Sequence, residues 1–432
     1  MKIQKQAIFL FLLLFLSIYQ DLPTALVFGQ IASSPIIFLT LPMLLYLGTF
    51  KKMFFNKYCI YFINFFAYLS VVSIIYVIYL ILTKQTLVFL NENIILKTIK
   101  SSVYPVTGFI YYLFIYNYLQ RGKNTLDNLF KAMLAILILI AIYLPFEIHY
   151  TTLSAEFLSS LHAMSYKYWR IRLLTSEESF VGTIFTIFIF VTIFLVNYLN
   201  KSNRTKIVTY IISLFILILY VYYSQSKGFL LLILVSILPM TIQYIYANEK
   251  IKKNVIYLTP FFIFLFVFVF IVLYDVLSEK QNTDGTFGTR FTSYFAGFRV
   301  VLTHPFGVGW GAFIYYYPEA ILETINDRII TGYDLSEIKT YLTTTKNLST
   351  KTELFDGIAM GGIGFLYFYY KFFIKRYLDL LKNKQTIFFY LKAPLLFSLL
   401  AGAIYISYLI KYEVWFLLAL IDVIQKKEYE KE

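Results

Sequence analysis

Apolar residues dominate the chain in runs of about twenty, and short polar pieces separate one run from the next. A helix of about twenty residues crosses the hydrocarbon core of a bilayer, which is about 30 Å thick. The pattern therefore predicts an all-α, polytopic integral membrane protein in which residues 1–432 form a single membrane domain. Twelve spans are expected, at about 7–20, 31–50, 58–82, 101–119, 128–148, 180–199, 207–223, 229–247, 254–277, 354–374, 386–410 and 412–425.

Every second polar piece is basic, and these pieces together hold 22 of the 38 lysines and arginines. Cytoplasmic loops of membrane proteins carry such an excess of positive charge. The distribution predicts that both termini are cytoplasmic. The basic pieces are "MKIQKQ", "KKMFFNK", "RGKNTLDNLFK", "NKSNRTK", "NEKIKK", "KFFIKRYLDLLKNK" and "QKKEYEKE".

Composition agrees with the membrane class and excludes several others. Charged residues make up 14% of the chain, whereas a soluble domain carries about 25%. The net charge of +14 follows from the cytoplasmic excess, so a nucleic-acid partner is not needed to explain it. The single cysteine, Cys59, can form no internal disulfide.

Two segments on the expected outer side are long, at about 149–179 and 278–353. A connection of this length is usually functional or separately folded. The stretch "AILETINDRIITGYDLSEIKTYL" has apolar residues at helical spacing, which predicts amphipathic helix over the membrane surface. The second segment is nearly neutral, so the positive-inside rule does not explain its seven basic residues, which are Lys280, Arg290, Arg299, Arg328, Lys339, Lys346 and Lys351.

Motifs for several common chemistries are absent from the sequence. There is no H-E-x-x-H, no cysteine–histidine cluster and no phosphate-binding P-loop, and no D-x-D triplet of metal-dependent glycosyltransferases. The three histidines, His149, His162 and His304, are too few and too scattered to indicate a metal site. We therefore expect no metal and no cofactor.

Cations at the outer ends of four segments form the candidate site. They occur in "YWRIRLLTSEESFVG", "SQSKGF", "RFTSYFAGFRVVLTHPFGVGWGAF" and "STKTELFDG". Arginine binds phosphate oxygens with two prongs, and lysine binds them as a point charge. The candidate binding residues are Arg170, Arg172, Lys227, Arg290, Arg299, His304 and Lys351.

Each candidate also has a simpler explanation. Arg170 and Arg172 can reach lipid headgroups, and Lys227 can be an ordinary turn residue. Lys351 can form a solvated ion pair with Glu353, which stabilises little. His304 precedes Pro305 and suits a plain loop.

Glycines in the same region carry two interpretations. Gly307, Gly309 and Gly311 either let the backbone approach a ligand or form a tight turn, and the turn is the simpler expectation. Gly357 and Gly361 are spaced as G-x-x-x-G in an expected span, which predicts close packing against another helix.

The order and spacing of these motifs resemble the O-antigen ligase/polymerase superfamily over about 170–370. "GTRFTSYFAGFRVVLTHPFGVGWGAF" is similar to its arginine, helix and "hPl-G-GvG-x-F" segment, and "SQSKGFLLLILVS" to its "S-R-G" turn, with Lys227 where arginine is usual. "TKTELFDGIAMGGIGF" is similar to its segment ending in two spaced glycines. "RIRLLTSEESFVG" is similar to its arginine-containing loop before a helix.

The resemblance implies a polymerase of the cell envelope that joins undecaprenyl-diphosphate-linked repeat units into O-antigen or capsule by metal-independent glycosyl transfer. The lipid-linked oligosaccharide is then donor and acceptor, and membrane lipid, a chain-length regulator and a flippase are further partners. The resemblance also implies a location in a bacterial inner membrane, with the site facing the periplasm or exterior. The catalytic candidates are Arg290 and Arg172 at the leaving diphosphate, with Glu177 or Glu178 as the base for the acceptor hydroxyl.

Two alternatives remain. A ligase that transfers the glycan to lipid A core or to protein shares this chemistry, but ligases of the superfamily carry a histidine near the place of Thr350, and no histidine follows His304. A transporter or lipid-oligosaccharide flippase would show repeats, broken helices and charges at mid-membrane. The sequence has no repeat. The nearest such charges are Asp275, Asp356, Lys392 and Glu413.

Overall fold

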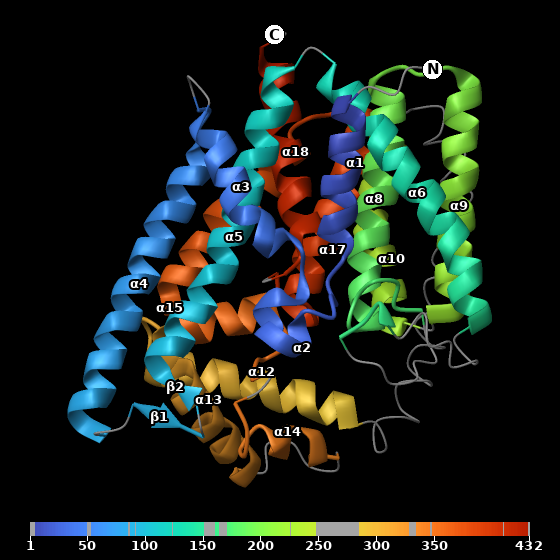
Figure 1. Cartoon of the computed structure of the whole chain (residues 1–432). Coiled ribbons are helices and arrows are strands. Elements are labelled where there is room, and N and C mark those ends of the chain that lie inside the picture. The colour runs from blue at the N-terminus through green and yellow to red at the C-terminus, as the bar shows by residue number, and fades with distance from the viewer. Residues whose placement is uncertain are drawn as a thin grey trace.

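The structure is a computed structural model and is almost entirely helical (Figure 1). It describes residues 5–430 except 50–52, 85–86, 91, 123, 151–159, 164–170, 225, 248–284, 328–333, 346–347 and 409. The elements are α1 (Lys5–Ile18), α2 (Ala25–Phe28), η1 (Gln30–Ser33), α3 (Ile36–Gly48), α4 (Lys57–Lys84), β1 (Val88–Phe89), β2 (Glu92–Asn93), α5 (Ile94–Arg121), α6 (Thr125–Tyr150), α8 (Glu178–Tyr198), α9 (Asn203–Ser224), α10 (Lys227–Ala247), α12 (Gly285–Thr303), α13 (Gly309–Asn326), α14 (Ser336–Thr340), α15 (Glu353–Tyr369), η2 (Tyr370–Ile374), α16 (Lys375–Leu381), η3 (Thr386–Phe388), α17 (Phe389–Ile404) and α18 (Tyr412–Tyr429).

The expected all-α class is confirmed and the helices are consistent with a membrane protein, but the twelve expected spans are not confirmed. Six helices of the described chain are long and apolar enough to cross a membrane. They cover Lys57–Thr83, Thr125–His149, Ser179–Tyr198, Asn203–Ser224, Glu353–Leu381 and Thr386–Ile404. The apolar helices α1 and α3, and the apolar part of α10, are shorter than this. The expected span at 254–277 lies outside the described residues.

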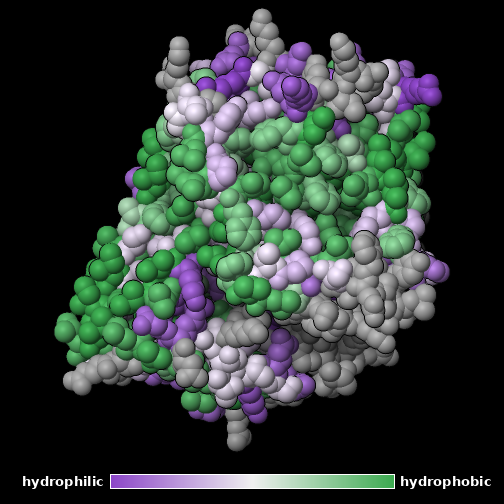
Figure 2. Space-filling view, viewed as in Figure 1, coloured by the Kyte–Doolittle hydropathy of each residue, from purple (hydrophilic) through white to green (hydrophobic). Residues whose placement is uncertain are grey.

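The long helices form a bundle with two distinct ends (Figure 1). The helices nearest the two chain termini, α1 and α18, begin or end at one end of it, called here the terminal end. Helices α12, α13 and α14 lie at the opposite end, called the α12 end. Hydrophobic residues cover much of the middle of the visible face, and hydrophilic residues gather at the terminal end and again toward the α12 end (Figure 2).

The long segment at 278–353 is helical over much of its described part. Helix α12 lies across the end of the bundle and packs against α13, α14 and α15 (Figure 1). The helical spacing expected from Ala320 onward is found in two pieces, the end of α13 and the short α14. This segment is therefore a cap of packed helices over one end of the bundle.

The glycine-rich turn between α12 and α13 packs into a break in α15. Gly307 and Gly309 have φ values of +79° and +76°, and Gly362 interrupts α15 with φ +53°. The Val308 amide donates to the Ala359 carbonyl at 3.1 Å, and the Ile363 amide donates to Pro305 at 2.9 Å. The turn expected here is confirmed, and its glycines also allow two backbones to meet.

Helix α18 lies in the centre of the bundle (Figure 1). From Tyr412 to Ile424 every residue of it is buried. It packs chiefly against α5 and also contacts α8 and α1. Gly108 of α5 allows the Trp415 ring to approach, since a Cβ there would lie 2.5 Å from the indole. The polar residues of α18 are therefore interior groups that need partners.

Candidate functional site

Helices α8, α10, α15 and α18 are among those that begin at the α12 end of the bundle (Figure 1). The first amide groups of a helix lack intrahelical acceptors, and the helix dipole places partial positive charge there. A group of helix N-termini on one side of a membrane is therefore suited to bind an anion. Some of the cations predicted from the sequence lie close to these N-termini, and others lie farther away.

Arg290 lies in the first half of α12 and is half-buried. Its guanidinium carbon is 5.8 Å from the centre of the Tyr405 ring. Among the residues that the structure describes, no carboxylate is within ion-pair distance of Arg290. Its charge is therefore available to an outside ligand.

Tyr405 ends α17 and is itself a candidate that the sequence did not reveal. Its side chain is 5% exposed, and within the described chain its hydroxyl has no hydrogen-bond partner. A buried donor without a partner is rare and costly unless a ligand or water satisfies it. A Cβ on Gly228 would lie 3.9 Å from the Tyr405 ring, so the start of α10, where Lys227 is located, reaches the same place.

Lys351 lies just before α15, in a backbone conformation with φ +63°. Its ammonium is 5.8 Å from the centre of the Tyr341 ring. Burial favours the neutral form, but Tyr341 and the charges of Glu177 and Glu337 outweigh it and raise the Lys351 pKa. Glu353 does not form the ion pair considered for Lys351 and instead accepts from the Tyr408 amide at 2.8 Å.

Glu337 joins the Arg290 helix to Lys351. It accepts a hydrogen bond from the Thr289 hydroxyl at 3.2 Å, directly beside Arg290 in α12. Its charge also raises the pKa of Lys351. The residue next to Arg290 and the Lys351 ammonium therefore both lie close to one short helix, α14, and its C-cap Tyr341.

Glu177 is exposed and occupies the residue before α8. Its negative charge favours the protonated form of both Lys351 and Lys411. Lys411, before α18, is fully buried, and its ammonium lies 3.4 Å from the centre of the Phe180 ring. Burial lowers the Lys411 pKa to about 7, although Glu413 and Glu177 act in the opposite direction. Glu177 is therefore an exposed carboxylate whose charge acts on both amines.

Arg172 belongs to a neighbouring buried cluster. Its Nη1 is 3.8 Å from Asp21, which also contacts His162 Nδ1 at 2.8 Å. The Arg172 and Leu173 amides donate to the Glu147 carboxylate at 2.9 and 3.0 Å. These contacts hold the loop that carries Glu177 against the bundle.

Arg299 and His304 lie toward the other end of α12. Arg299 forms ion pairs with Glu323 of α13 and with Asp327, the residue that follows α13. His304 Nδ1 is 2.9 Å from the Tyr76 hydroxyl. About nine residues of helix separate Arg290 from Arg299, or roughly 14 Å. These two residues are thus apart from the group around Arg290.

Three further candidates cannot be placed. Arg170 lies outside the described residues, as do the side chains of Glu178 and Lys227. The backbone positions of the latter two are the first residues of α8 and α10.

We use the name Arg290 cluster for Arg290, Tyr405, Lys351, Glu177 and Lys411.

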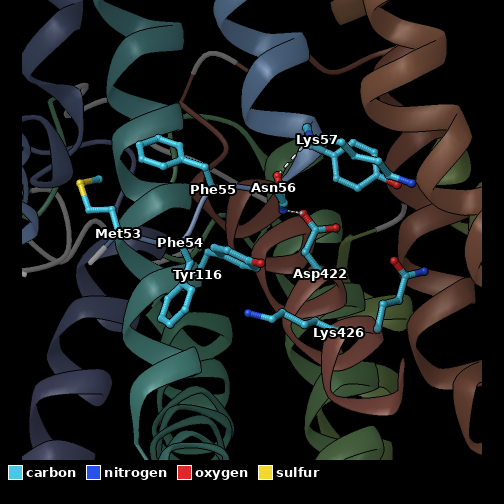
Figure 3. Close-up of a pocket in the computed structure, with 10 residues that line it drawn as sticks. Met53, Phe54, Phe55, Asn56, Lys57, Tyr116, Asp422 and Lys426 are labelled. Carbon is cyan, nitrogen blue, oxygen red and sulfur yellow. Dashed lines mark hydrogen bonds between the residues drawn. The ribbon is translucent and has the colours of Figure 1, made fainter. Parts of the chain in front are cut away.

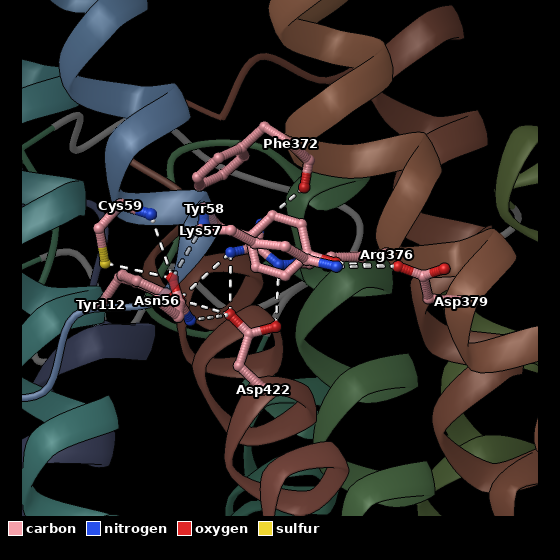
Figure 4. A network of polar contacts seen from close by, with 9 residues as sticks. All are labelled: Asn56, Lys57, Tyr58, Cys59, Tyr112, Phe372, Arg376, Asp379 and Asp422. Carbon is pink, nitrogen blue, oxygen red and sulfur yellow. Dashed lines mark hydrogen bonds and ion pairs between the residues drawn. The ribbon is translucent and has the colours of Figure 1, made fainter.

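A second polar group, near the terminal end, was not foreseen. Arg376 lies in a piece expected to be a cytoplasmic basic loop, but it is 0% exposed and pairs with Asp422 of α18 (Figure 4). Nε and Nη2 of Arg376 contact the two carboxylate oxygens at 3.0 Å each. Tyr112 and Asn56 donate to the same carboxylate, and Phe372 accepts from Arg376 at 2.7 Å. We call these residues the Arg376 network.

The Arg290 cluster can do two things chemically. The Arg290 guanidinium and the charged Lys351 can hold a phosphate or diphosphate group, with the helix N-termini adding to the attraction. Glu177 can accept a proton from a hydroxyl group placed beside it. In the described part of the chain no group of three or more His, Cys, Asp and Glu could hold a metal ion.

Comparisons with known proteins give no family assignment. No protein-family model matches the chain. No curated protein matches it either.

Proposed function

We propose that this chain is a membrane-embedded glycosyltransferase that polymerises undecaprenyl-diphosphate-linked oligosaccharide repeat units into a surface polysaccharide. The observation that supports it best is Arg290, a cation without an ion-pair partner in the described chain, over the ring of Tyr405, whose hydroxyl also has no partner there. The α12 end of the bundle would face the outside of a bacterial cytoplasmic membrane, and both termini would be cytoplasmic. The proposal agrees with the resemblance of "RFTSYFAGFRVVLTHPFGVGWGAF" to the polymerase/ligase superfamily.

In the proposed reaction, the acceptor hydroxyl oxygen bonds to the anomeric carbon of the donor glycan. The bond from that carbon to the diphosphate oxygen breaks, and its electron pair leaves with the diphosphate. Arg290 and Lys351 stabilise the negative charge that develops there, and the Tyr405 hydroxyl donates to the same group. Glu177 receives the proton of the acceptor hydroxyl.

In this proposal Arg172 is a positioning residue for the loop that carries Glu177. It is buried against Asp21, and its amide donates to Glu147, so it fixes the loop that presents Glu177. Arg299 is neutralised by two carboxylates and contributes to the packing of α12 on α13.

A transporter is the second candidate, because the bundle has an ion pair in its interior and an interrupted helix. Arg376 and Asp422 are buried, and α15 is broken at Gly362. Such features mark substrate pathways in carriers. Purified protein that lengthens a lipid-linked glycan in detergent, without an energy source, would decide for the transferase, since detergent solution has no second compartment.

Arg290 variants test the proposal. Arg290→Ala should lower the polymerisation rate of purified protein by about 10²–10³-fold, the usual cost of losing one transition-state donor. Arg290→Lys should keep part of the activity, because lysine retains the charge but not the two-pronged geometry. The readout is glycan length on a gel after incubation with lipid-linked repeat units.

The matched control is Arg204→Ala, which removes an exposed arginine from the start of α9 at the opposite end of the bundle. Normal polymer from a stably expressed Arg290→Ala protein would contradict the proposed role. In cells, loss of a polymerase leaves one repeat unit on the acceptor. Loss of a ligase leaves the acceptor bare, with lipid-linked chains accumulating.

A further inference from the structure

An open cavity of about 490 Å³ lies beside the Arg376 network, near the terminal end of the bundle (Figure 3). Asp422 and Lys426 of α18 line it, together with Tyr116 of α5 and the residues that lead into α4. A volume of this size suits a small ligand or a lipid headgroup. Its lining residues are Met53, Phe54, Phe55, Asn56, Lys57, Tyr58, Tyr116, Asp422, Gln425 and Lys426.

The carboxylate of Asp422 is already neutralised where it meets this cavity. Its two oxygens accept from Arg376, and one also accepts from Asn56 at 2.9 Å. Asn56 in turn uses its own carbonyl oxygen to cap the first turn of α4. This side of the cavity is therefore close to neutral. The lysines at the opening then determine the sign of the net charge around the cavity.

Two lysines lie on opposite sides of Asp422 in Figure 3. Lys57 is 52% exposed and shares Asp379 with Lys382, which leaves that group of three charges with a net positive charge. Lys426 is 3.9 Å from Glu430, at the limit of an ion pair, and its ammonium lies 4.4 Å from the centre of the Phe54 ring. The opening thus favours a negatively charged group.

Apolar surface continues from the same opening. Phe55 is 56% exposed, and Ile60 and Ile63 on the first turns of α4 are 57% and 50% exposed. The two isoleucines belong to a helix that is long and apolar enough to cross a membrane. A ligand in the cavity can therefore keep hydrocarbon chains along α4 while its polar head lies between the lysines.

We infer that this cavity binds the phosphate-containing headgroup of an anionic phospholipid from the leaflet at the terminal end. Lys57 and Lys426 hold the phosphate, and Gln425 and Tyr116 line the same cavity as polar neighbours of the headgroup. Basic pockets between membrane helices bind such headgroups in other proteins. The inference does not depend on the proposed glycosyl transfer.

Native mass spectrometry of delipidated protein tests it, with phosphatidylglycerol and phosphatidylcholine as probes. Saturable binding of one phosphatidylglycerol is expected, in preference to phosphatidylcholine. Each of Lys57→Gln and Lys426→Gln should weaken it about fivefold, the effect typical of one lysine near anionic lipid. The double variant should weaken it about 25-fold, the product of two such independent effects.

The control is Lys206→Gln with Lys384→Gln, which removes two charges outside the cavity lining. Equal loss of lipid in the control would show diffuse surface attraction and overturn the inference. Absence of saturable binding, or no preference over phosphatidylcholine, would also overturn it. Glycerol 1-phosphate and inorganic phosphate are tested as well, because binding of either as tight as that of the lipid would assign the cavity to a soluble phosphate. If the double variant does not fold, the two single variants decide the question.

Discussion

Removing one partner of the Arg376–Asp422 pair should destabilise the protein strongly. In Asp422→Asn the guanidinium of Arg376 stays 0% exposed but loses its counter-charge. In Arg376→Met the Asp422 carboxylate keeps only Tyr112 and Asn56 as donors. In both cases a buried charge is left without compensation.

The expected magnitude follows from the geometry. The pair has two contacts of 3.0 Å, and the side chains are 0% and 3% exposed, so solvent screens it little. Breaking such a pair from one side costs about 3–5 kcal/mol. The double variant, Arg376→Met with Asp422→Asn, leaves no unpaired charge at this place, and the asparagine side chain in it still offers an acceptor to Tyr112. It should therefore cost far less than the sum of the single changes.

The measurement is the free energy of unfolding of detergent-solubilised protein, taken for the native chain, both single variants and the double variant. We expect a coupling energy of about 2 kcal/mol or more. Lys382→Met is a useful comparison, since it removes a partner of Asp379 that is 77% exposed and should cost under about 1 kcal/mol. Additive single changes, within about 0.5 kcal/mol, would refute the claim that this pair is interior and tightly coupled.

Two further results are expected. Burial lowers the Lys411 pKa to about 7, whereas a lysine in the unfolded chain titrates near 10.4. Between these two pH values the unfolded chain therefore binds more protons than the folded chain. The free energy of unfolding should rise with pH across that window. Lys411→Met should flatten the rise, and unchanged pH profiles would contradict the assignment. Gly362→Ala should lower the unfolding temperature by several degrees, because φ is +53° and a Cβ would lie 2.1 Å from the Pro305 carbonyl. Gly48→Ala, with open space around it, should have little effect, and equal shifts would argue against the packed turn.

The helical membrane class was predictable from the sequence because it depends on composition over many residues. Runs such as those of α4, α8 and α17 are predominantly apolar, and no tertiary information is needed to recognise them. The turn at Gly307 was equally accessible, since glycine and proline mark such positions locally.

The Arg376 network was not predictable in the same way. Arg376 stands in "KFFIKRYLDLLKNK", whose composition is that of a cytoplasmic basic piece. The apolar helix continues past it as far as Leu381, through a π-helical turn at Tyr370–Ile374, and Asp422 is 46 residues away. Hydropathy shows that a charge is near a span but not which residue neutralises it.

The sequence predicted some members of the candidate site but not their contacts. Arg290, Lys351 and Glu177 were selected as outward groups, and the structure brings the helices and loops that carry them together. Tyr405 and Lys411 were missed because an aromatic residue and a lysine at a span end are common and carry no local signal. Arg299 could not be separated from Arg290 in sequence, since its carboxylate partners lie outside α12.

Two buried carboxylates on opposite sides of helix α18 bind residues of the surrounding helices and loops. Glu413 near its start accepts from Gln20 and Thr183, and Asp422 in its second half pairs with Arg376. Nine residues of α-helix advance about 13.5 Å and turn through about two and a half revolutions, so the two carboxylates point in nearly opposite directions. Any rotation of α18 about its own axis would pull both carboxylates from their partners at once. The central helix is therefore fixed against rotation, and any rearrangement within the bundle has to be made by the helices around it.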